Sequence, residues 1–447
     1  MPTINTKPLS GFLELTPNEQ IEFDNIKNII EKVYNKYGFT SLDTPLVERS
    51  EVLLAKGGTE ADKQIYFVQN GIVGGEKNDQ ALRFDLTVPL ARYTAEHFDK
   101  LSFPFKRCHL NRVYRGERAQ KGRFREFYQC DIDVIGRGSL SINYDAEVVA
   151  VIYDIFRQLD FGKFTIRISN RKLYNGLFEA LAIETDFLQV LSIIDKVEKI
   201  SPAAFLEELK SLKLTQIQID KITSFMNIKG DYNQIFDELL ALDIDNAIYA
   251  EGLEELKKVT SLLTLMGVEQ DYFKIDLNIV RGLDYYTGTI FETTLDNSPI
   301  GSVCSGGRYD DLASSYTKEK LPGVGISIGL SRLFWQLKEH GYITHKKQTI
   351  ADIIVVPDRD SNLELAIKTA TILRENGLKV DLLLEEFNIK KKLNYLDKKE
   401  TPFAVIVKTT KEDIDVISLQ YKQGNDIIKE ELDLDSLTSR IKELRKH

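Results

Sequence analysis

Apolar residues near the start of the chain recur at the spacing of a helix. They are Ile26, Ile29, Ile30, Val33 and Tyr37. This spacing places them on one face of an amphipathic helix. The preceding residues 16–19, Thr-Pro-Asn-Glu, have the pattern of a capping box with proline at the first helical position. The pattern therefore predicts a helix that starts at this box and ends at Gly38, a common helix terminator.

Alternating apolar and polar residues predict strands further along. In the run 82–87, apolar residues alternate with Arg83, Asp85 and Thr87, which would share one strand face. Pro89 then begins a helix. The alternation predicts a half-buried strand that ends shortly before this helix.

Two longer extended stretches, 105–115 and 124–135, flank the polar loop 116–122 and predict an antiparallel hairpin. Another strand is predicted at 39–47, where Pro45 favours a sheet edge or an interface. The remaining predicted strands are 164–169, 289–295, 302–304 and 324–328. The last of these leads into a helix with the apolar stripe Leu330, Leu333, Phe334 and Leu337.

The periodicity also divides the chain. Between residues 171 and 262 it becomes helical and interrupts the strand-rich sequence. We predict a domain formed by 1–170 and 263–337, with a helical insertion at 171–262. After a linker at 338–350, strands and helices alternate again, which indicates a small α/β domain at 351–447. The chain as a whole is expected to be of the α/β class.

The composition is that of a globular protein. The 447 residues, 43% of them hydrophobic and 28% charged, suffice for two or three domains. No apolar run approaches the roughly 18 residues that a membrane span needs. The N-terminus lacks the basic and apolar pattern of a secretory signal. We therefore expect a cytoplasmic protein that is not associated with a membrane.

Cysteine and histidine offer little metal chemistry. Cys108, Cys130 and Cys304 are widely separated, and the five histidines have no ligand spacing. This pattern argues against a disulfide framework and against a metal held by side chains. A magnesium ion carried by a phosphate ligand stays open, because it needs few protein ligands.

Charge is distributed unevenly. The net charge of −9 argues against a non-specific nucleic-acid coat. Residues 106–125, however, carry eight basic side chains and one acidic one, Glu117. On the returning strand of the hairpin, Gln129, Asp131 and Asp133 share one face, where like charges are costly unless a ligand or partner balances them. The pattern fits either a confined ligand site or a solvated charged hairpin.

Three further segments carry candidate chemistry. Residues 280–288 combine two glycines with adjacent tyrosines that could enclose a ring-shaped ligand. Residues 305–310 offer a Gly-Gly turn whose amides could meet a carboxylate. Residues 323–332 run from strand to helix and leave Arg332 in the first helical turn. Their glycine spacing and the antiparallel character of the neighbouring strands exclude a dinucleotide-binding fold.

Taken in order, these segments resemble the motifs of a known family. Residues 44–48, the hairpin around Arg115 and residues 325–332 look like the three motifs of class II aminoacyl-tRNA synthetases. Residues 281–286 and 306–310 resemble two signatures of histidyl-tRNA synthetases. The resemblance covers nearly the whole chain, including the helical insertion and a C-terminal anticodon-binding domain. It implies a catalytic domain with a mainly antiparallel sheet flanked by helices.

The resemblance implies a two-step reaction. The carboxylate of L-histidine attacks the α-phosphate of ATP, and the 3′-terminal ribose of tRNA(His) then takes the histidyl group. By motif position, Arg115 would hold the α-phosphate, Glu117 the adenine and Arg332 the γ-phosphate, with Mg²⁺ bridging the outer phosphates. Arg281 would lie between the histidine carboxylate and the α-phosphate, so Arg281 and Arg115 are the expected catalytic residues.

The resemblance also implies the amino-acid site and the contacts to partners. The expected histidine-binding residues, besides Arg281, are Asp85, Thr87, Gln129, Asp133, Tyr285, Tyr286 and Tyr309. The loop residues expected at the tRNA acceptor end are Gln120, Arg123 and Arg125. A homodimer would form through the proline-bearing first motif. Asp85 and Ser331 depart from the common bacterial motifs, which have glutamate at both positions.

Two alternatives remain at this point. A non-catalytic regulatory subunit of ATP phosphoribosyltransferase shares the histidine-binding fold, but usually lacks the anticodon-binding domain and the signature arginines. Arg115, Arg281 and Arg332 are all present here. A class II synthetase for threonine or proline would need different pocket residues and would leave 281–286 unexplained.

Overall fold

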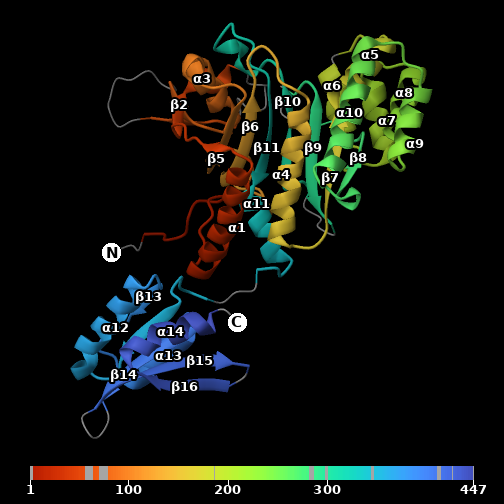
Figure 1. Cartoon of the computed structure of the whole chain (residues 1–447). Helices are drawn as coiled ribbons and strands as arrows, with labels where there is room; N and C mark the ends of the chain where they lie inside the picture. The colour runs from red at the N-terminus through yellow and green to blue at the C-terminus, as the bar shows by residue number, and fades with distance from the viewer. Residues whose placement is uncertain are drawn as a thin grey trace. The chain divides into compact units, whose positions relative to one another are not determined.

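The computed structural model describes the greater part of the chain in two compact units (Figure 1). The described residues are 4–55, 64–69, 79–185, 187–280, 286–296, 301–343, 347–409, 414–424 and 426–445. Unit 1 comprises Met1–Glu14 and Ile26–Tyr342, and unit 2 comprises Leu15–Asn25 and Ile343–His447. No helix within these ranges is long and apolar enough to cross a membrane.

Unit 1 is built on an eight-stranded sheet with the order β1-β5-β6-β11-β10-β9-β7-β8. In chain order, the first four strands of this sheet are β1 Thr40–Ser41, β5 Phe105–Tyr114, β6 Glu126–Ile135 and β7 Phe164–Asn170. The others are β8 Phe273–Ile275, β9 Thr289–Leu295, β10 Cys304–Tyr309 and β11 Gly323–Gly329. All neighbours are antiparallel except the outer pairs β1 with β5 and β7 with β8. The mainly antiparallel sheet and the hairpin of β5 and β6 confirm the sequence predictions.

Helices cover one face of this sheet. Helix α4 (Asn143–Leu159) contacts β7, β10 and β11. Helix α1 (Pro17–Lys36) lies on the same face, where the Tyr34 hydroxyl donates to the carbonyl of Cys130 on β6 at 2.8 Å. Helix α11 (Leu330–Glu339) directly follows β11, and its apolar stripe is buried as predicted. At the start of α1 the Thr16 amide donates to the Glu19 carboxylate at 2.8 Å, as expected for a capping box, and the Thr16 hydroxyl donates to the same oxygen.

The segment between β7 and β8 is helical, and Figure 1 shows its helices gathered beside the edge of the sheet that these two strands form. They are α5 Arg171–Ala180, α6 Phe187–Ile194, α7 Pro202–Ser211, α8 Gln216–Met226, α9 Tyr232–Ala241 and α10 Ala247–Leu265. Helix α10 packs on α5, α4 and β7, while α9 contacts β8. The helical group therefore packs against the edge of the sheet that β7 and β8 form.

A smaller three-stranded sheet with the order β2-β4-β3 adjoins helices α2 and α3. Its elements are β2 Val47–Arg49, β3 Tyr66–Val68, β4 Gln80–Leu82, α2 Ser50–Leu54 and α3 Thr87–His97. The strand predicted at 39–47 is in fact two short strands, β1 and β2, in different sheets. Pro45 lies between them, because a residue without an amide hydrogen interrupts a ladder.

The strand predicted for 82–87 is wrong beyond Leu82. The chain turns there and enters α3 at Thr87, two positions before Pro89. The Asp85 Oδ1 atom accepts the amide hydrogen of Val88 at 3.1 Å. An aspartate that bonds to the first helical amides favours a helix start over a strand, and the alternation gave no sign of this bond.

The strand predicted at 302–304 was also misplaced. Strand β10 begins at Cys304, where the predicted strand ended, and runs through Gly306 and Gly307. These glycines were expected to form a turn. A Cβ atom on Gly306 would collide with the carbonyl of Gly325 on β11, so glycine serves close strand approach here.

Unit 2 is a mixed five-stranded sheet with the order β13-β12-β14-β15-β16. Its strands are β12 Ile353–Pro357, β13 Val380–Leu382, β14 Phe403–Thr409, β15 Asp415–Gln423 and β16 Asp426–Leu432. Its helices are α12 Leu363–Glu375, α13 Ile389–Lys399 and α14 Leu434–Leu444. Ile353 and Val355 pack into one apolar cluster, and Ile354 and Val356 into another. Burial on both faces explains the continuous apolar run of β12.

Arg308 on β10 forms a buried ion pair with Asp145 at the start of α4. Its Nη2 atom lies 2.6 Å from Asp145 Oδ1, and the guanidinium also donates to the carbonyls of Leu140 and Ser141. The Thr289 hydroxyl donates to the second carboxylate oxygen at 2.6 Å. The pair thus ties the helix layer to the two central strands β9 and β10.

We expect Asp145→Ala to lower the free energy of unfolding of unit 1 by about 3 to 5 kcal/mol, because it leaves Arg308 buried without its counter-ion. Denaturant titration measures this change. Lys36→Ala removes the exposed partner of Asp154, at 3.1 Å, and as a control should cost less than about 1 kcal/mol. A loss no larger for Asp145→Ala than for the control would contradict this role.

Candidate active site

The face of the large sheet opposite α4 carries a cluster of buried polar side chains. In the strand register Arg107 of β5 lies beside Asp133 of β6, and Asp131 of β6 lies beside Ser327 of β11. Gln129 is the next residue of β6 on this face. Cross-strand neighbours on one face are in contact distance. The hairpin and β11 therefore bring acids, a guanidinium and an amide together.

Asp133 is held from two sides. The Tyr309 hydroxyl donates to its Oδ1 atom at 2.9 Å, and Arg107 Nη2 lies 2.8 Å from its Oδ2 atom. A Cβ atom on Gly325 would collide with this carboxylate. Because Gly325 has no side chain, the Asp133 carboxylate can lie against β11 at this position.

Asp131 and Gln129 are joined through Ser327. The Gln129 amide nitrogen donates to the Ser327 hydroxyl oxygen at 2.7 Å, and this hydroxyl is hydrogen-bonded to Asp131. Asp131 is 2% exposed. Burial raises the pKa of its carboxyl to about 7, although the charge of Arg107 and the Ser327 bond oppose the rise. Asp133 has its pKa raised by the same burial, against Arg107 and Tyr309.

Asp85 approaches the cluster from the start of α3. Burial raises the pKa of its carboxyl to about 6, against the amide bond from Val88 and the charges of Arg115 and Arg107. Arg115 is fixed nearby, because its Nε atom donates to the Phe84 carbonyl at 3.0 Å. The structure thus places Asp85 near Asp133, with Thr87 at the first position of α3.

Several buried atoms of this cluster have no hydrogen-bond partner within the described residues. They are Asp85 Oδ2, Gln129 Oε1, Asp131 Oδ1 and two nitrogens of Arg107, Nε and Nη1. Buried polar groups are rarely left unpaired, so these oxygens and nitrogens mark a place for a polar ligand. Because two of these groups are carboxylates and a third is an amide oxygen, against one guanidinium, the face favours a ligand with cationic or N–H donors.

A second group of predicted residues lies in the loop between β5 and β6. Arg125 Nε donates to the Glu117 carbonyl at 3.0 Å, and Arg123 Nη1 lies 3.4 Å from the Glu117 carboxylate. Gln120 and Arg123 exchange backbone hydrogen bonds across the turn. Burial lowers the pKa of Arg332, and the neighbouring Arg123 lowers it further. Arg332 on α11 is thus brought close to this basic loop.

Two predicted residues, Arg281 and Tyr285, lie outside the described residues. The chain on either side of them is held by Arg171 at the start of α5. Its Nη1 atom donates to the Val280 carbonyl at 2.9 Å, and its backbone amide donates to the Gly288 carbonyl at 2.8 Å. The helical segment therefore anchors both ends of the stretch that carries Arg281.

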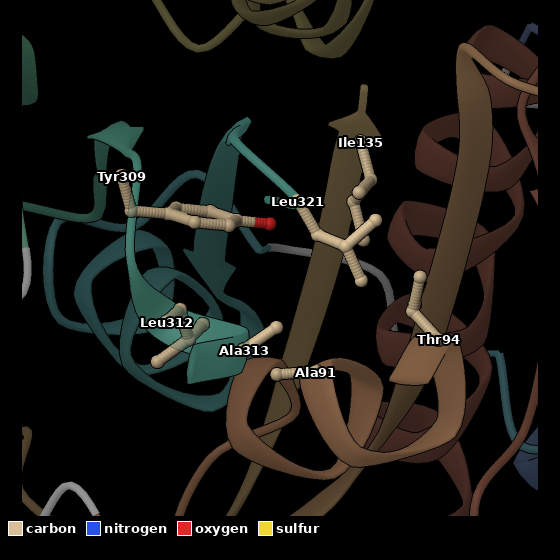
Figure 2. Close-up of a pocket in the computed structure, with 7 residues that line it drawn as sticks. All are labelled: Ala91, Thr94, Ile135, Tyr309, Leu312, Ala313 and Leu321. Carbon is tan, nitrogen blue, oxygen red and sulfur yellow. The ribbon is translucent and has the colours of Figure 1, made fainter. Parts of the chain in front are cut away.

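Tyr286 and Tyr309 belong to the same cluster. The pKa of Tyr286 is raised by burial and by the charges of Asp133, Asp131 and Asp85. Figure 2 shows the Tyr309 ring at a small pocket, with its hydroxyl directed inward. The pocket is lined by Ala91, Thr94, Ile135, Tyr309, Leu312, Ala313 and Leu321. Apolar packing around this ring helps to fix the hydroxyl that donates to Asp133.

Sequence reasoning missed Arg107 and Ser327 as site residues and left Asp131 without a role. Arg107 was counted only in the local charge of the hairpin. A register for β5 against β6 would have placed it beside Asp133. Ser327 had no detectable signal, because its neighbour Asp131 is 196 positions away along the chain.

The chain is similar to known proteins over most of its length. A family model described as "Histidyl-tRNA synthetase" matches residues 11–333, and one described as "Anticodon binding domain" matches 351–444. The "Histidine--tRNA ligase" of Clostridium tetani is 52% identical over 401 residues, which are 89% of this chain and 90% of the relative. That of Finegoldia magna is 45% identical over 405 residues, 90% of this chain and 92% of the relative.

Among solved structures, the histidyl-tRNA synthetase from Nostoc sp. PCC 7120 matches with a TM-score of 0.88 and 39% identity, covering 99% of this chain and 100% of that one. An ATP phosphoribosyltransferase regulatory subunit/histidyl-tRNA synthetase from Bacillus halodurans matches with a TM-score of 0.75 and 22% identity, covering 92% of this chain and 100% of that chain; it shares the fold. A synthetase domain followed by an anticodon-binding domain defines an aminoacyl-tRNA synthetase. The chain belongs to the histidyl-tRNA synthetase family.

The raised pKa of Asp131, about 7, predicts a pH-dependent stability. The folded state holds a proton on this group that the unfolded chain releases above pH of about 4, so its contribution to stability falls as pH rises from about 4 to 7. Asparagine cannot ionise. We expect Asp131→Asn to be stabilised relative to the parent by on the order of a few kcal/mol more at pH 8 than at pH 5.

Thermal and denaturant unfolding at several pH values measure this difference. Asp99→Asn changes an exposed aspartate of the same unit and should give a difference that does not vary with pH. If the difference in stability between Asp131→Asn and the parent were also independent of pH, Asp131 would not carry the proton.

Proposed function

We propose that this chain activates L-histidine with ATP to form histidyl-adenylate and transfers the histidyl group to the 3′ end of tRNA(His). The observation that carries this proposal is the sheet face with unpaired carboxylate and amide oxygens beside Arg115. A protonated amino acid fits the acidic end, and a nucleotide phosphate fits the basic end. Membership of the histidyl-tRNA synthetase family supports the same reaction.

The amino-acid half of the site comprises Asp85, Thr87, Gln129, Asp133, Tyr285, Tyr286 and Tyr309. Histidine presents an ammonium group and imidazole N–H groups, which are the donors that the unpaired oxygens of this face need. A site that requires such bonds rejects isosteres without them by several orders of magnitude. Asp85 is one methylene shorter than glutamate, and its place at the start of α3 brings its carboxylate to the cluster nonetheless.

The ATP half comprises Arg115 at the α-phosphate, Arg332 at the γ-phosphate and Glu117 at the adenine. Arg115 is held by the Phe84 carbonyl, and its guanidinium lies 5.2 Å from the centre of the Phe127 ring. The fixed guanidinium can bind phosphate oxygens in a bidentate manner. The Ser331 hydroxyl oxygen accepts the amide hydrogen of Tyr128 on β6 at 2.9 Å, which joins the start of α11 to β6.

Magnesium would bind at the outer phosphates. The acidic side chains that act on Arg332 are Glu292 and Glu117, so carboxylates are available at this end of the site. Because Mg²⁺ keeps several waters and needs few protein ligands, these residues fit such an ion. Its chemistry there is to neutralise charge on the leaving pyrophosphate.

The first step joins two anions, the histidine carboxylate and the α-phosphate. Arginines that face both groups offset this repulsion and the charge that grows in the transition state. Arg115 and Arg281 are the residues proposed for this role. No side-chain base is needed, because the attacking carboxylate is already ionised at neutral pH.

The tRNA would be bound at two places. Gln120, Arg123 and Arg125 would meet the acceptor end, and the domain at 351–447 would bind the anticodon. Arg125 already holds the Glu117 carbonyl, so it would act partly by shaping the loop. Phosphate contacts there position the acceptor end, and contacts to base edges specify it.

The remaining organisation follows from the family resemblance. The catalytic domain would comprise 1–170 and 263–337, with an insertion at 171–262 and a linker at 338–350. A homodimer through residues 44–48 is supported by exposed apolar side chains on and beside the small sheet, Leu46, Val47 and Phe67. The protein would act in the cytoplasm. A histidine-binding regulatory subunit would need neither the basic loop nor the anticodon-binding domain, so charging is the better supported activity.

Exchange of labelled pyrophosphate into ATP tests the first step. We expect exchange with L-histidine and none above background with threonine or proline, because only histidine supplies the ring donors that the pocket is proposed to bind. Parallel assays with each amino acid give the measurement. Exchange supported by an amino acid other than histidine would refute the proposed specificity.

Two arginine variants separate the two steps. Arg115→Ala should slow pyrophosphate exchange by about a hundredfold or more, as for loss of a donor aimed at developing charge. Arg123→Ala should leave exchange nearly unchanged and weaken charging of tRNA. Arg112→Ala changes an arginine of β5 three positions before Arg115, with a side chain that is 58% exposed; it is the control and should affect neither. Loss of exchange in Arg123→Ala without tRNA would refute the assignment of the loop.

A further inference from the structure

Arg107 is a buried cation in the floor of the proposed histidine pocket. It is 0% exposed and lies on β5 beside Asp133. Its Nη2 atom is 2.8 Å from Asp133 Oδ2 and donates to the Leu86 carbonyl at 3.0 Å. This carbonyl lies next to Asp85 in the chain. The one guanidinium thus contacts two elements, β6 and the start of α3, that supply the pocket.

The acids of this face need a counter-ion. Asp85, Asp131 and Asp133 are each 2% exposed, and crowded carboxylates raise one another's pKa. Arg107 is the foremost group that lowers the pKa of both Asp131 and Asp133, against the effect of burial. Without this charge, the buried carboxylates would favour their neutral form.

The other basic groups nearby do not fill this role. His109, the next residue of β5 on this face, lies 2.7 Å from Asp43, and burial together with Arg107 and Arg83 lowers its pKa to about 3. Histidine with such a pKa is uncharged at neutral pH. Arg83 donates to the carbonyls of Thr44 and Arg112. Within the described residues of this face, Arg107 is therefore the fully buried charge beside the acids of β6.

The bonds of Arg107 also differ from those of a structural arginine. Arg308, on the other face of the sheet, donates through all three nitrogens to Asp145 and two carbonyls. Arg107 keeps Nε and Nη1 without a partner among the described residues, as does Asp131 with its Oδ1 atom. Incomplete satisfaction of buried groups is typical of sites that hold a ligand or position its ligands.

We propose that Arg107 is a positioning residue for histidine recognition, which acts through Asp133 by holding this carboxylate charged and in place for the N–H donors of the amino acid. This inference rests on the proposed function. Arg107 and Asp133 form the buried ion pair. The loss of the cation alone leaves a buried carboxylate without its counter-ion, whereas the loss of both charges leaves neither group unpaired.

Steady-state pyrophosphate exchange with the full-length protein tests this inference. Arg107→Met should raise the KM for histidine by about 30-fold or more, as for the loss of one partner of a buried charge pair. The KM for ATP should change by less than about threefold, because Arg107 lies in the amino-acid half of the site. A general loss of structure would instead raise the KM for both substrates. Equal changes in the two KM values, or no change in either, would overturn the proposal.

A double-mutant cycle provides the sharper test. Asp133→Asn should raise the KM for histidine in the parent but change it much less in the Arg107→Met background, since the two side chains act as one ion pair. An equal rise in both backgrounds would overturn the pairing. If Arg107→Met does not fold, the double variant should fold, and its failure to fold would also overturn the pairing.

Two controls separate charge from shape. Arg107→Lys keeps the cation and should keep the KM for histidine within about fivefold of the parent; a loss as large as that of Arg107→Met would overturn the charge argument. Arg308→Met should lower the melting temperature while changing the KM for histidine less than Arg107→Met does. Absence of histidine-dependent exchange in the parent would instead overturn the proposed function.

Discussion

The ion pair between Arg107 and Asp133 is the interaction on which the site depends. It joins β5 to β6 inside the protein, at 2.8 Å and almost without solvent. A buried pair of this kind contributes little net stability, because desolvation of both charges offsets their attraction. We infer that its value lies in function. The positive charge of Arg107 favours the charged form of Asp133 in a place where burial and neighbouring carboxylates favour the neutral form.

The sheet separates structural bonds from site chemistry by its alternation of side chains. Arg308 and Tyr309 are consecutive on β10, yet one joins Asp145 beneath the helix layer and the other donates to Asp133 in the site. Successive side chains of a strand point to opposite faces. One short strand therefore anchors the fold through one residue and positions the pocket through the next.

The helical segment contributes to the site through its first residue. Arg171 donates to the chain on both sides of residues 281–285, and its neighbours Asn170 and Lys172 bond to Glu255 on α10. Helix α10 in turn packs on α4 and β7. The chain on both sides of the proposed catalytic arginine is thus held by the first residue of α5, whose neighbours bond to a helix that packs on the sheet.

Features that arise from local periodicity and local bonds could be read from the sequence. The start of α1, the two strands of the β5–β6 hairpin and the apolar stripe of α11 each follow from patterns that are a few residues long. The set of candidate site residues came from ordered motifs, but not their arrangement. Tertiary structure decided that β10 passes through its glycines and that Arg107 lies beside Asp133. Strand register also sets contacts between residues as far apart as Gln129 and Ser327, 198 positions along the chain, where no hairpin turn joins the two strands and fixes their register.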